Sequence, residues 1–144
     1  MREEIIKQEH IITGIQVANW EEAIQASGDL LIKSGAVSTE YVKQMIQSVK
    51  DNGPYIVIGP GIAMAHARPS EAVRENAISL AVLKEAVSFG HEENDPVDLV
   101  FSFSAKEADS HLKMMESLSR VLIDEQKVEQ LRQAKTAKEI YQLL

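Results

Sequence analysis

Short segments with strand periodicity, separated by pairs of segments with helical periodicity, constrain the fold of this chain more than any other feature. The clearest strand pattern is VDLVFSF, Val97–Phe103, in which every odd-numbered position is apolar and predicts one buried face. Three further segments are expected to form strands: His10–Ala18, Tyr55–Ile58 and Ala77–Leu83. Strands mixed with helix pairs, rather than in strict alternation, predict an α/β (α+β) sheet of about four or five strands covered on both faces.

Helix-start and helix-stop signals bound the remaining segments. They are Asn19 with Glu22 at the start of the first helix, Gly35 at its end, Ser38 and Gly53-Pro54 around the second, and Thr136 with Glu139 at the start of the last. From Ala108 onward the whole chain has a helical pattern. No repeat or linker divides the sequence, so we expect a single domain over residues 1–144.

Composition excludes several classes of function. The net charge of −7 and the pI of about 5.1 disfavour a surface that binds nucleic acid or anionic lipid. Because the chain has no cysteine, thiol catalysis and zinc–thiolate sites are excluded. It has neither a signal peptide nor an apolar run of membrane-spanning length, so we expect a cytoplasmic protein with no direct membrane insertion.

The segment Gly59–Pro69, GPGIAMAHARP, places one imidazole in unusual surroundings. The small side chains on both sides of His66 leave its ring open to an incoming group, and we expect Pro60 and Pro69 to stiffen a loop that presents it. Arg68 follows two residues later and is suited to phosphate or carboxylate oxygens. The segment has neither a Walker A nor a dinucleotide-binding pattern.

A second histidine, His111, lies near the start of the helix that begins around Asp109. It is in phase with Met115 and Leu118, which predicts that its ring faces the protein. A helix N-terminus also favours an anion. The other two histidines, His10 and His91, are expected to be ordinary surface or hydrogen-bonded residues, the latter in a polar turn.

These residues narrow the chemistry. A metal site is not expected, because no third ligand stands at a recognisable spacing such as H-E-x-x-H. A serine hydrolase is not expected either, because the G-x-S-x-G turn is missing. What remains is an imidazole that itself accepts an anionic group. A non-enzymatic module that only holds a small anion stays an alternative.

Four separated motifs resemble the IIA domains of the bacterial phosphoenolpyruvate-dependent sugar phosphotransferase system, in the mannitol/fructose class. They are GPYIVIGPGIAM at Gly53–Met64, HARP at His66–Pro69, HEENDPVD at His91–Asp98 and DSHLK at Asp109–Lys113. They are most similar to the L-ascorbate-type IIA protein. The resemblance covers the chain from about Ile5 to Leu144.

The resemblance implies a phosphotransferase without a cofactor, on a three-layer α/β/α sandwich. His66 would accept a phosphoryl group from the histidine-containing phosphocarrier protein and pass it to a cysteine of the IIB component. Sugar, either L-ascorbate or a related compound, would be phosphorylated as it crosses the membrane through the IIC component. His111 would be the second active-site histidine. The alternative within this fold is a regulatory phosphohistidine switch of the nitrogen-related type, not coupled to transport.

The sequence departs from the family pattern at two positions. Ala65 replaces the proline that usually precedes the active histidine, and Ser48 stands where the mannitol branch has arginine. We expect Arg68 to supply the missing positive charge. For His66 we expect attack through Nε2, with the other ring nitrogen held by a backbone carbonyl. Two neighbours of the histidine, Ile62 and Met64, are expected either to seat the carrier or to pack inward.

Overall fold

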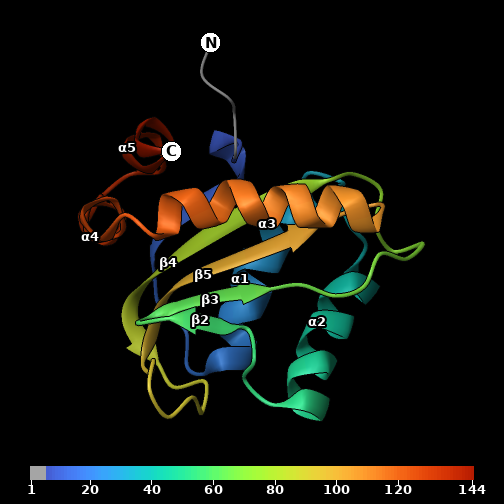
Figure 1. Cartoon of the computed structure of the whole chain (residues 1–144), viewed down its shortest axis with the longest axis horizontal. Helices are drawn as coiled ribbons and strands as arrows, with labels where there is room; N and C mark the ends of the chain where they lie inside the picture. The colour runs from blue at the N-terminus through green and yellow to red at the C-terminus, as the bar shows by residue number, and fades with distance from the viewer. Residues whose placement is uncertain (1–5) are drawn as a thin grey trace.

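The computed structural model describes residues 6–144 (Figure 1). Its strands are β1 (Ile11–Ile15), β2 (Val57–Gly59), β3 (Ile62–Ala65), β4 (Ala77–Val87) and β5 (Val97–Ser104). Its helices are the 3-10 turn η1 (Gln8–His10), α1 (Trp20–Lys33), α2 (Thr39–Asn52), α3 (Ala108–Leu122), α4 (Glu125–Gln133) and α5 (Ala137–Leu143). Within residues 6–144, none of these helices combines the length and the apolar character that a membrane crossing requires.

The strands form one mixed sheet in the order β1-β4-β5-β3-β2. Two neighbouring pairs are parallel, β1 with β4 and β3 with β5, whereas β4–β5 and β2–β3 are antiparallel. This confirms the expected mixed α/β fold. One strand was not predicted: β3 lies inside the segment Gly59–Pro69, which we expected to be a loop. Its four residues are all buried, so no alternation marks them as a strand.

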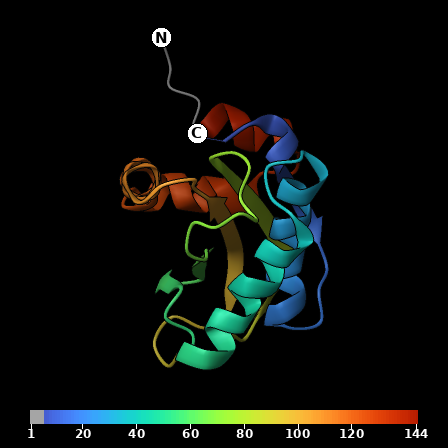
Figure 2. The same ribbon diagram turned by 90° about the vertical axis from the view of Figure 1, so that its right-hand side faces the viewer.

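Helices cover both faces of the sheet and complete three layers (Figure 2). On one face, α1 and α2 enclose an apolar cluster that includes Ile24, Leu31 and Met45. On the other face, α3, α4 and α5 enclose a second cluster around Phe101 and Leu118. The central strands β4 and β5 are therefore buried on both sides, as a covered sheet requires.

The alternation predicted for β5 holds from Leu99 to Phe103 but not at Val97. Leu99 and Phe103 belong to the cluster under α3, whereas Val97 belongs to the opposite cluster. The amides of Asp98 and Leu99 both donate to the carbonyl oxygen of Gly61, at 3.1 and 3.0 Å. Two residues therefore face one, as in a β-bulge, and the side-chain alternation shifts by one position.

The predicted helix boundaries are largely confirmed. The Asn19 side chain accepts from the Glu22 amide at 2.9 Å, and Thr136 accepts from Glu139 at 3.1 Å. Gly53 ends α2 with a φ of 83°, a conformation that glycine adopts without strain. His10 is buried, as the end of η1, and its Nε2 lies 2.8 Å from Oγ of Ser34.

The loop between β4 and β5 is closed by its own polar groups. The Asp95 carboxylate accepts hydrogen bonds from the amides of Phe89, Gly90 and His91 and from the Ser88 hydroxyl. Desolvation raises the pKa of this carboxyl group, but the hydrogen bonds outweigh desolvation and the net pKa is lowered. The Nδ1 atom of His91 accepts hydrogen bonds from the backbone amides of residues 93 and 94. His91 is therefore a turn residue, as predicted.

The C-terminal helices also anchor the hairpin that leads into β3. Arg132 on α4 donates through Nε to both carboxylate oxygens of Asp98, at 3.0 and 3.1 Å. Its Nη2 donates to the carbonyl oxygen of Pro60 at 2.6 Å. A Cβ atom added at Gly61 would lie 2.5 Å from the same guanidinium, so this position needs glycine for space as well as for its φ of 74°.

Candidate active site

His66 follows the last residue of β3, at the end of the sheet where β5 also finishes. Its Nδ1 lies 3.1 Å from the carbonyl oxygen of Met64. Because a carbonyl oxygen can only accept, the neutral ring carries its proton on Nδ1 and keeps the lone pair on Nε2. This is the arrangement predicted from the sequence, and it leaves Nε2 as the nucleophilic atom.

Two aromatic rings fix the plane of the His66 imidazole. Phe103, the penultimate residue of β5, stacks on it with a centroid distance of 5.0 Å and an interplanar angle of 21°. Tyr55 meets it edge-on at 5.9 Å and 89°. The ring of Phe103 is buried, whereas His66 itself is half-buried. The imidazole of His66 therefore rests on the apolar core and keeps one side toward solvent.

His111 comes from the first turn of α3 and reaches the same place, as predicted. Its ring centroid lies 5.1 Å from that of His66 and 4.9 Å from that of Phe103. Nε2 of His111 is buried and has no hydrogen-bond partner within residues 6–144. A buried polar atom without a protein partner is rare and calls for an explanation, such as a catalytic role or a bound water or ion.

Burial, and secondly the proximity of His66, lowers the pKa of the His111 imidazole. The ring is therefore neutral at pH 7 and can offer one N–H donor without carrying a charge into the apolar surroundings. Its neighbour Leu112 is 59% exposed and lies outside the apolar face of the helix. The inward line of α3 runs through His111 and Leu118.

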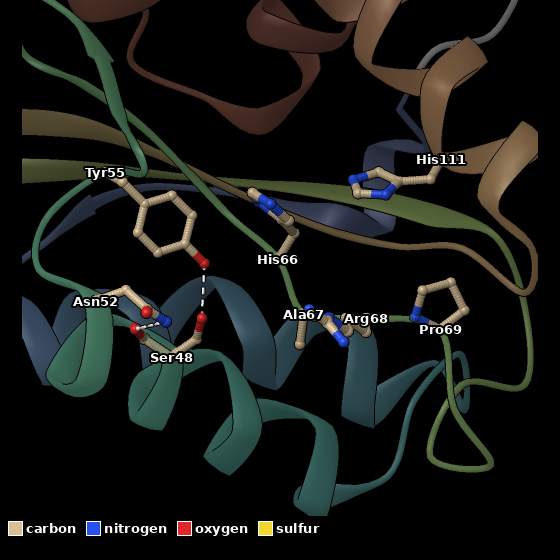
Figure 3. A pocket seen from close by; sticks show the side chains of 8 residues that line it. All are labelled: Ser48, Asn52, Tyr55, His66, Ala67, Arg68, Pro69 and His111. Carbon is tan, nitrogen blue, oxygen red and sulfur yellow. Dashed lines mark hydrogen bonds between the residues drawn. The ribbon is translucent and has the colours of Figure 1, made fainter.

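A pocket of about 260 Å³ opens beside the two histidines (Figure 3). Its lining residues are Ser48, Asn52, Tyr55, His66, Ala67, Arg68, Pro69 and His111. Arg68 is the one permanently charged side chain in this lining. It is exposed and forms no ion pair with the described part of the chain, so its guanidinium is free to meet an anion.

Three more side chains form this pocket wall: Ser48, which the sequence marks as a departure from the mannitol branch, and Asn52 and Tyr55, which it does not single out as site residues. The hydroxyl groups of Ser48 and Tyr55 lie 2.7 Å apart, and the amide of Asn52 donates to the Ser48 carbonyl oxygen at 3.0 Å. Figure 3 shows this trio on the far side of His66 from His111. No helical spacing joins all three, because Gly53 and Pro54 end the helix before Tyr55.

The burial of Ile62 and Met64 confirms one of their two expected roles, packing inward, and the position of Pro60 corrects another prediction. Ile62 and Met64 are 5% and 2% exposed, so they pack into the core and form no surface that could seat a carrier. Pro60 lies at the opposite end of β3 and cannot stiffen the backbone at His66. The pairing of β3 with β5, up to Ala65 and Ser102, holds that backbone instead.

The arrangement suits the transfer of an anionic group. It combines an imidazole lone pair on His66, an unpaired nitrogen on His111 and the guanidinium of Arg68 around one pocket. Within residues 6–144, no group of three or more metal-ligating side chains is placed to hold a metal ion.

Comparison with known proteins places this geometry in a family. Residues 4–144 match the family model of the phosphoenolpyruvate-dependent sugar phosphotransferase system, EIIA 2. The chain is 33% identical to the ascorbate-specific EIIA component of Salmonella choleraesuis, over all of this chain and 94% of that protein.

Two solved structures from Escherichia coli extend the likeness to the fold. The mannitol-specific cryptic enzyme IIA superposes with a TM-score of 0.88 and 30% identity, over 98% of this chain and 97% of that one. Enzyme IIA for mannitol, solved in complex with phosphorylated enzyme IIB, superposes with a TM-score of 0.85 and 31% sequence identity, over 96% of this chain and 95% of that one. The chain therefore belongs to the EIIA 2 family of the phosphoenolpyruvate-dependent sugar phosphotransferase system and is a phosphotransferase.

Proposed function

We propose that this protein, acting as one domain in the cytoplasm, carries a phosphoryl group on Nε2 of His66. It takes the group from the histidine-containing phosphocarrier protein and passes it to a cysteine of a IIB component, which works with a membrane IIC component. The observation that carries the proposal is the hydrogen bond from Nδ1 of His66 to the Met64 carbonyl, which directs the lone pair of Nε2 toward solvent and the pocket.

The transfer is balanced without a cofactor. Nε2 of His66 forms a bond to phosphorus as the bond between phosphorus and the donor imidazole breaks, and the donor nitrogen keeps the electron pair. The proton of His66 stays on Nδ1, hydrogen-bonded to the Met64 carbonyl oxygen, so the phosphorylated ring needs no further proton. In the second step the cysteine thiolate of IIB attacks phosphorus, and the bond between phosphorus and Nε2 of His66 breaks. Nε2 keeps the electron pair, so His66 returns to its neutral form.

Two groups of the pocket would stabilise the equatorial oxygens during transfer. The unpaired Nε2 of His111 supports a role as hydrogen-bond donor to one oxygen, and Arg68 supports a role as cation near the others. Both are in place before the group arrives, so little reorganisation accompanies the reaction. Removal of one such donor reduces the rate of comparable reactions by about 10²–10³-fold.

The phosphorylation test uses phosphoenolpyruvate labelled with radioactive phosphate and the two general upstream proteins. The wild-type chain should take up label that acid removes, with the mass of one phosphoryl group, and His66→Ala should take up none. A protein that only binds an anion gains no covalent mass. Undiminished labelling of His66→Ala would reject His66 as the carrier, provided that circular dichroism shows a folded variant.

The sugar is proposed from the relatives. The name of the Salmonella relative refers to ascorbate, so we propose that this chain serves a IIB component for L-ascorbate or a related sugar. Phosphorylated protein should pass its label to an ascorbate-type IIB at least tenfold faster than to a mannitol-type IIB. Equal rates would remove the sugar assignment, and failure to label any IIB would favour a regulatory phosphohistidine switch.

A further inference from the structure

The strands that carry His66 and Phe103 separate just where the active site begins. β3 and β5 pair in parallel as far as Ala65 and Ser102. Beyond this point the amide of Ala67 and the carbonyl of Phe103 do not bond to each other. The hydroxyl of Tyr41 lies between them: it accepts from the Ala67 amide at 3.0 Å and donates to the Phe103 carbonyl oxygen at 2.7 Å.

Tyr41 lies on α2, and its side chain is buried. Its side chain is 1% exposed, and its Oη also lies 3.1 Å from the Ala67 carbonyl oxygen. One hydroxyl has one proton, and the shorter contact, to Phe103, receives it. Burial, more than the proximity of Tyr55, raises the pKa of Tyr41 to about 12, so the hydroxyl remains a donor throughout the working range of pH.

The two groups that this hydroxyl joins are the two that position the nucleophile. Ala67 is the residue directly after His66, and Phe103 carries the ring on which His66 stacks. Direct pairing of the strands at this level would bring the two backbones together. The inserted hydroxyl instead takes the place of a hydrogen bond between the strands.

We propose that Tyr41 is a positioning residue whose hydroxyl keeps the ends of β3 and β5 apart at the separation that His66 needs for phosphoryl transfer. This inference rests on the proposed role of His66 as phosphoryl carrier. The ring of Tyr41 fills the core as a phenylalanine would, so the hydroxyl is the part that serves the site.

The test is Tyr41→Phe, assayed for phosphoryl transfer from the phosphorylated carrier protein. We expect kcat to fall at least tenfold with an unchanged KM, because the exposed residues around the pocket are untouched while the nucleophile is misplaced. The matched control is Val49→Ala, which weakens the packing of the same helix in the same cluster but removes no hydrogen-bonding side-chain group. It should lower the melting temperature and leave kcat within twofold.

The outcomes separate the two proposals. If wild-type protein takes no label, or if His66→Ala still does, the proposed function fails and the role of Tyr41 fails with it. If His66→Ala is inactive but Tyr41→Phe keeps the wild-type kcat, or loses activity only in KM, the positioning role alone is overturned.

A second measurement needs no variant and decides the matter if Tyr41→Phe does not fold. In the wild-type protein, the Ala67 amide should exchange its hydrogen at least a hundredfold more slowly than the amide of Arg68, which has no hydrogen-bond acceptor within residues 6–144. Equal exchange rates would show that the tether to Tyr41 is not maintained in solution and would overturn the proposal.

Discussion

The two ends of the sheet treat their polar groups in opposite ways. At the end where β5 begins, Asp95 accepts four hydrogen bonds and the Nδ1 atom of His91 accepts two. At the end where β5 finishes, Nε2 of His111 is buried without a partner within residues 6–144, and Arg68 has no anionic partner there. β5 spans the distance between them (Figure 1).

This difference separates a histidine that stabilises the fold from histidines that are available for chemistry. His91 already uses its ring nitrogen to close a turn, so no ligand is needed to satisfy it. His66 uses one nitrogen to fix its tautomer and leaves the other open, and His111 leaves a nitrogen unpaired. Unsatisfied hydrogen-bonding capacity, concentrated at one edge, is the physical mark of the active site.

The largest difference in transfer rate should appear between two variants that each lose one histidine, His66 at one end of the sheet and His91 at the other. His66→Ala should reduce phosphoryl transfer by at least about 10³-fold, because the nucleophile itself is lost. His91→Ala should stay within twofold of the wild-type rate, because within residues 6–144 the hydrogen bonds of its ring are to amides of its own turn. Rapid-quench measurements of labelled protein compare the two, and a large loss in His91→Ala would break the contrast between the ends.

His111→Phe should separate stability from activity. Transfer should slow by about 10²-fold because a donor to the phosphoryl group is lost. The free energy of unfolding should rise by about 1 kcal/mol, because the variant no longer buries a polar atom without a partner. Urea unfolding and transfer rates measure both quantities. A variant that is both less stable and fully active would contradict the assignment of His111.

Asp95→Ala should show the reverse behaviour at the opposite end. Three amides and one hydroxyl lose their acceptor in a partly exposed loop, so the free energy of unfolding should fall by about 1–2 kcal/mol. The transfer rate should not change, because the loop precedes β5 and lies at the end of the sheet opposite His66. Asp95→Asn, which keeps one carbonyl acceptor, should recover part of the stability. Slower transfer in these variants at full folding would show that the two ends are coupled.

The smallest effect is a pH dependence of stability. Burial lowers the pKa of His111, and burial is also the leading cause of the lowered pKa of His10. Between the folded pKa and the ordinary value of about 6.5, the unfolded chain therefore binds more protons, and stability decreases as pH falls through this window. Urea midpoints at pH 7.5 and 5.5 should show this decrease, and His111→Phe should reduce it. An equal decrease in that variant would assign the effect to other groups.

Much of the fold was predictable because its signals are local. Asn19 with Glu22 and Thr136 with Glu139 cap helices through contacts three residues apart, which a sequence displays directly. The strand β3 was missed because it is buried on both faces and so lacks alternation. The bulge at Gly61 was missed because it depends on how another strand, β5, meets the turn.

The histidines of the site could be predicted from the sequence, but the aromatic residues that position them could not. His66 and His111 stood out through their neighbours and their helical phase, and the structure brings their rings to 5.1 Å. Phe103 and Tyr41 did not stand out, because a large aromatic residue in an apolar pattern is ordinary core from sequence alone. Their relation to His66 spans 37 and 25 residues of chain, and only the packing of α2 and β5 creates it.

The link from Arg132 to the turn before β3 has a consequence for synthesis on the ribosome. His66 emerges long before α4, yet the turn that leads into its strand is anchored by Arg132, which lies 72 residues after Pro60. During translation, the hydrogen bond from Arg132 to the Pro60 carbonyl oxygen can form only after the last quarter of the polypeptide has begun to emerge. The start of β3, at the end of the strand opposite His66, is thus fastened late, when nearly the whole chain has been made.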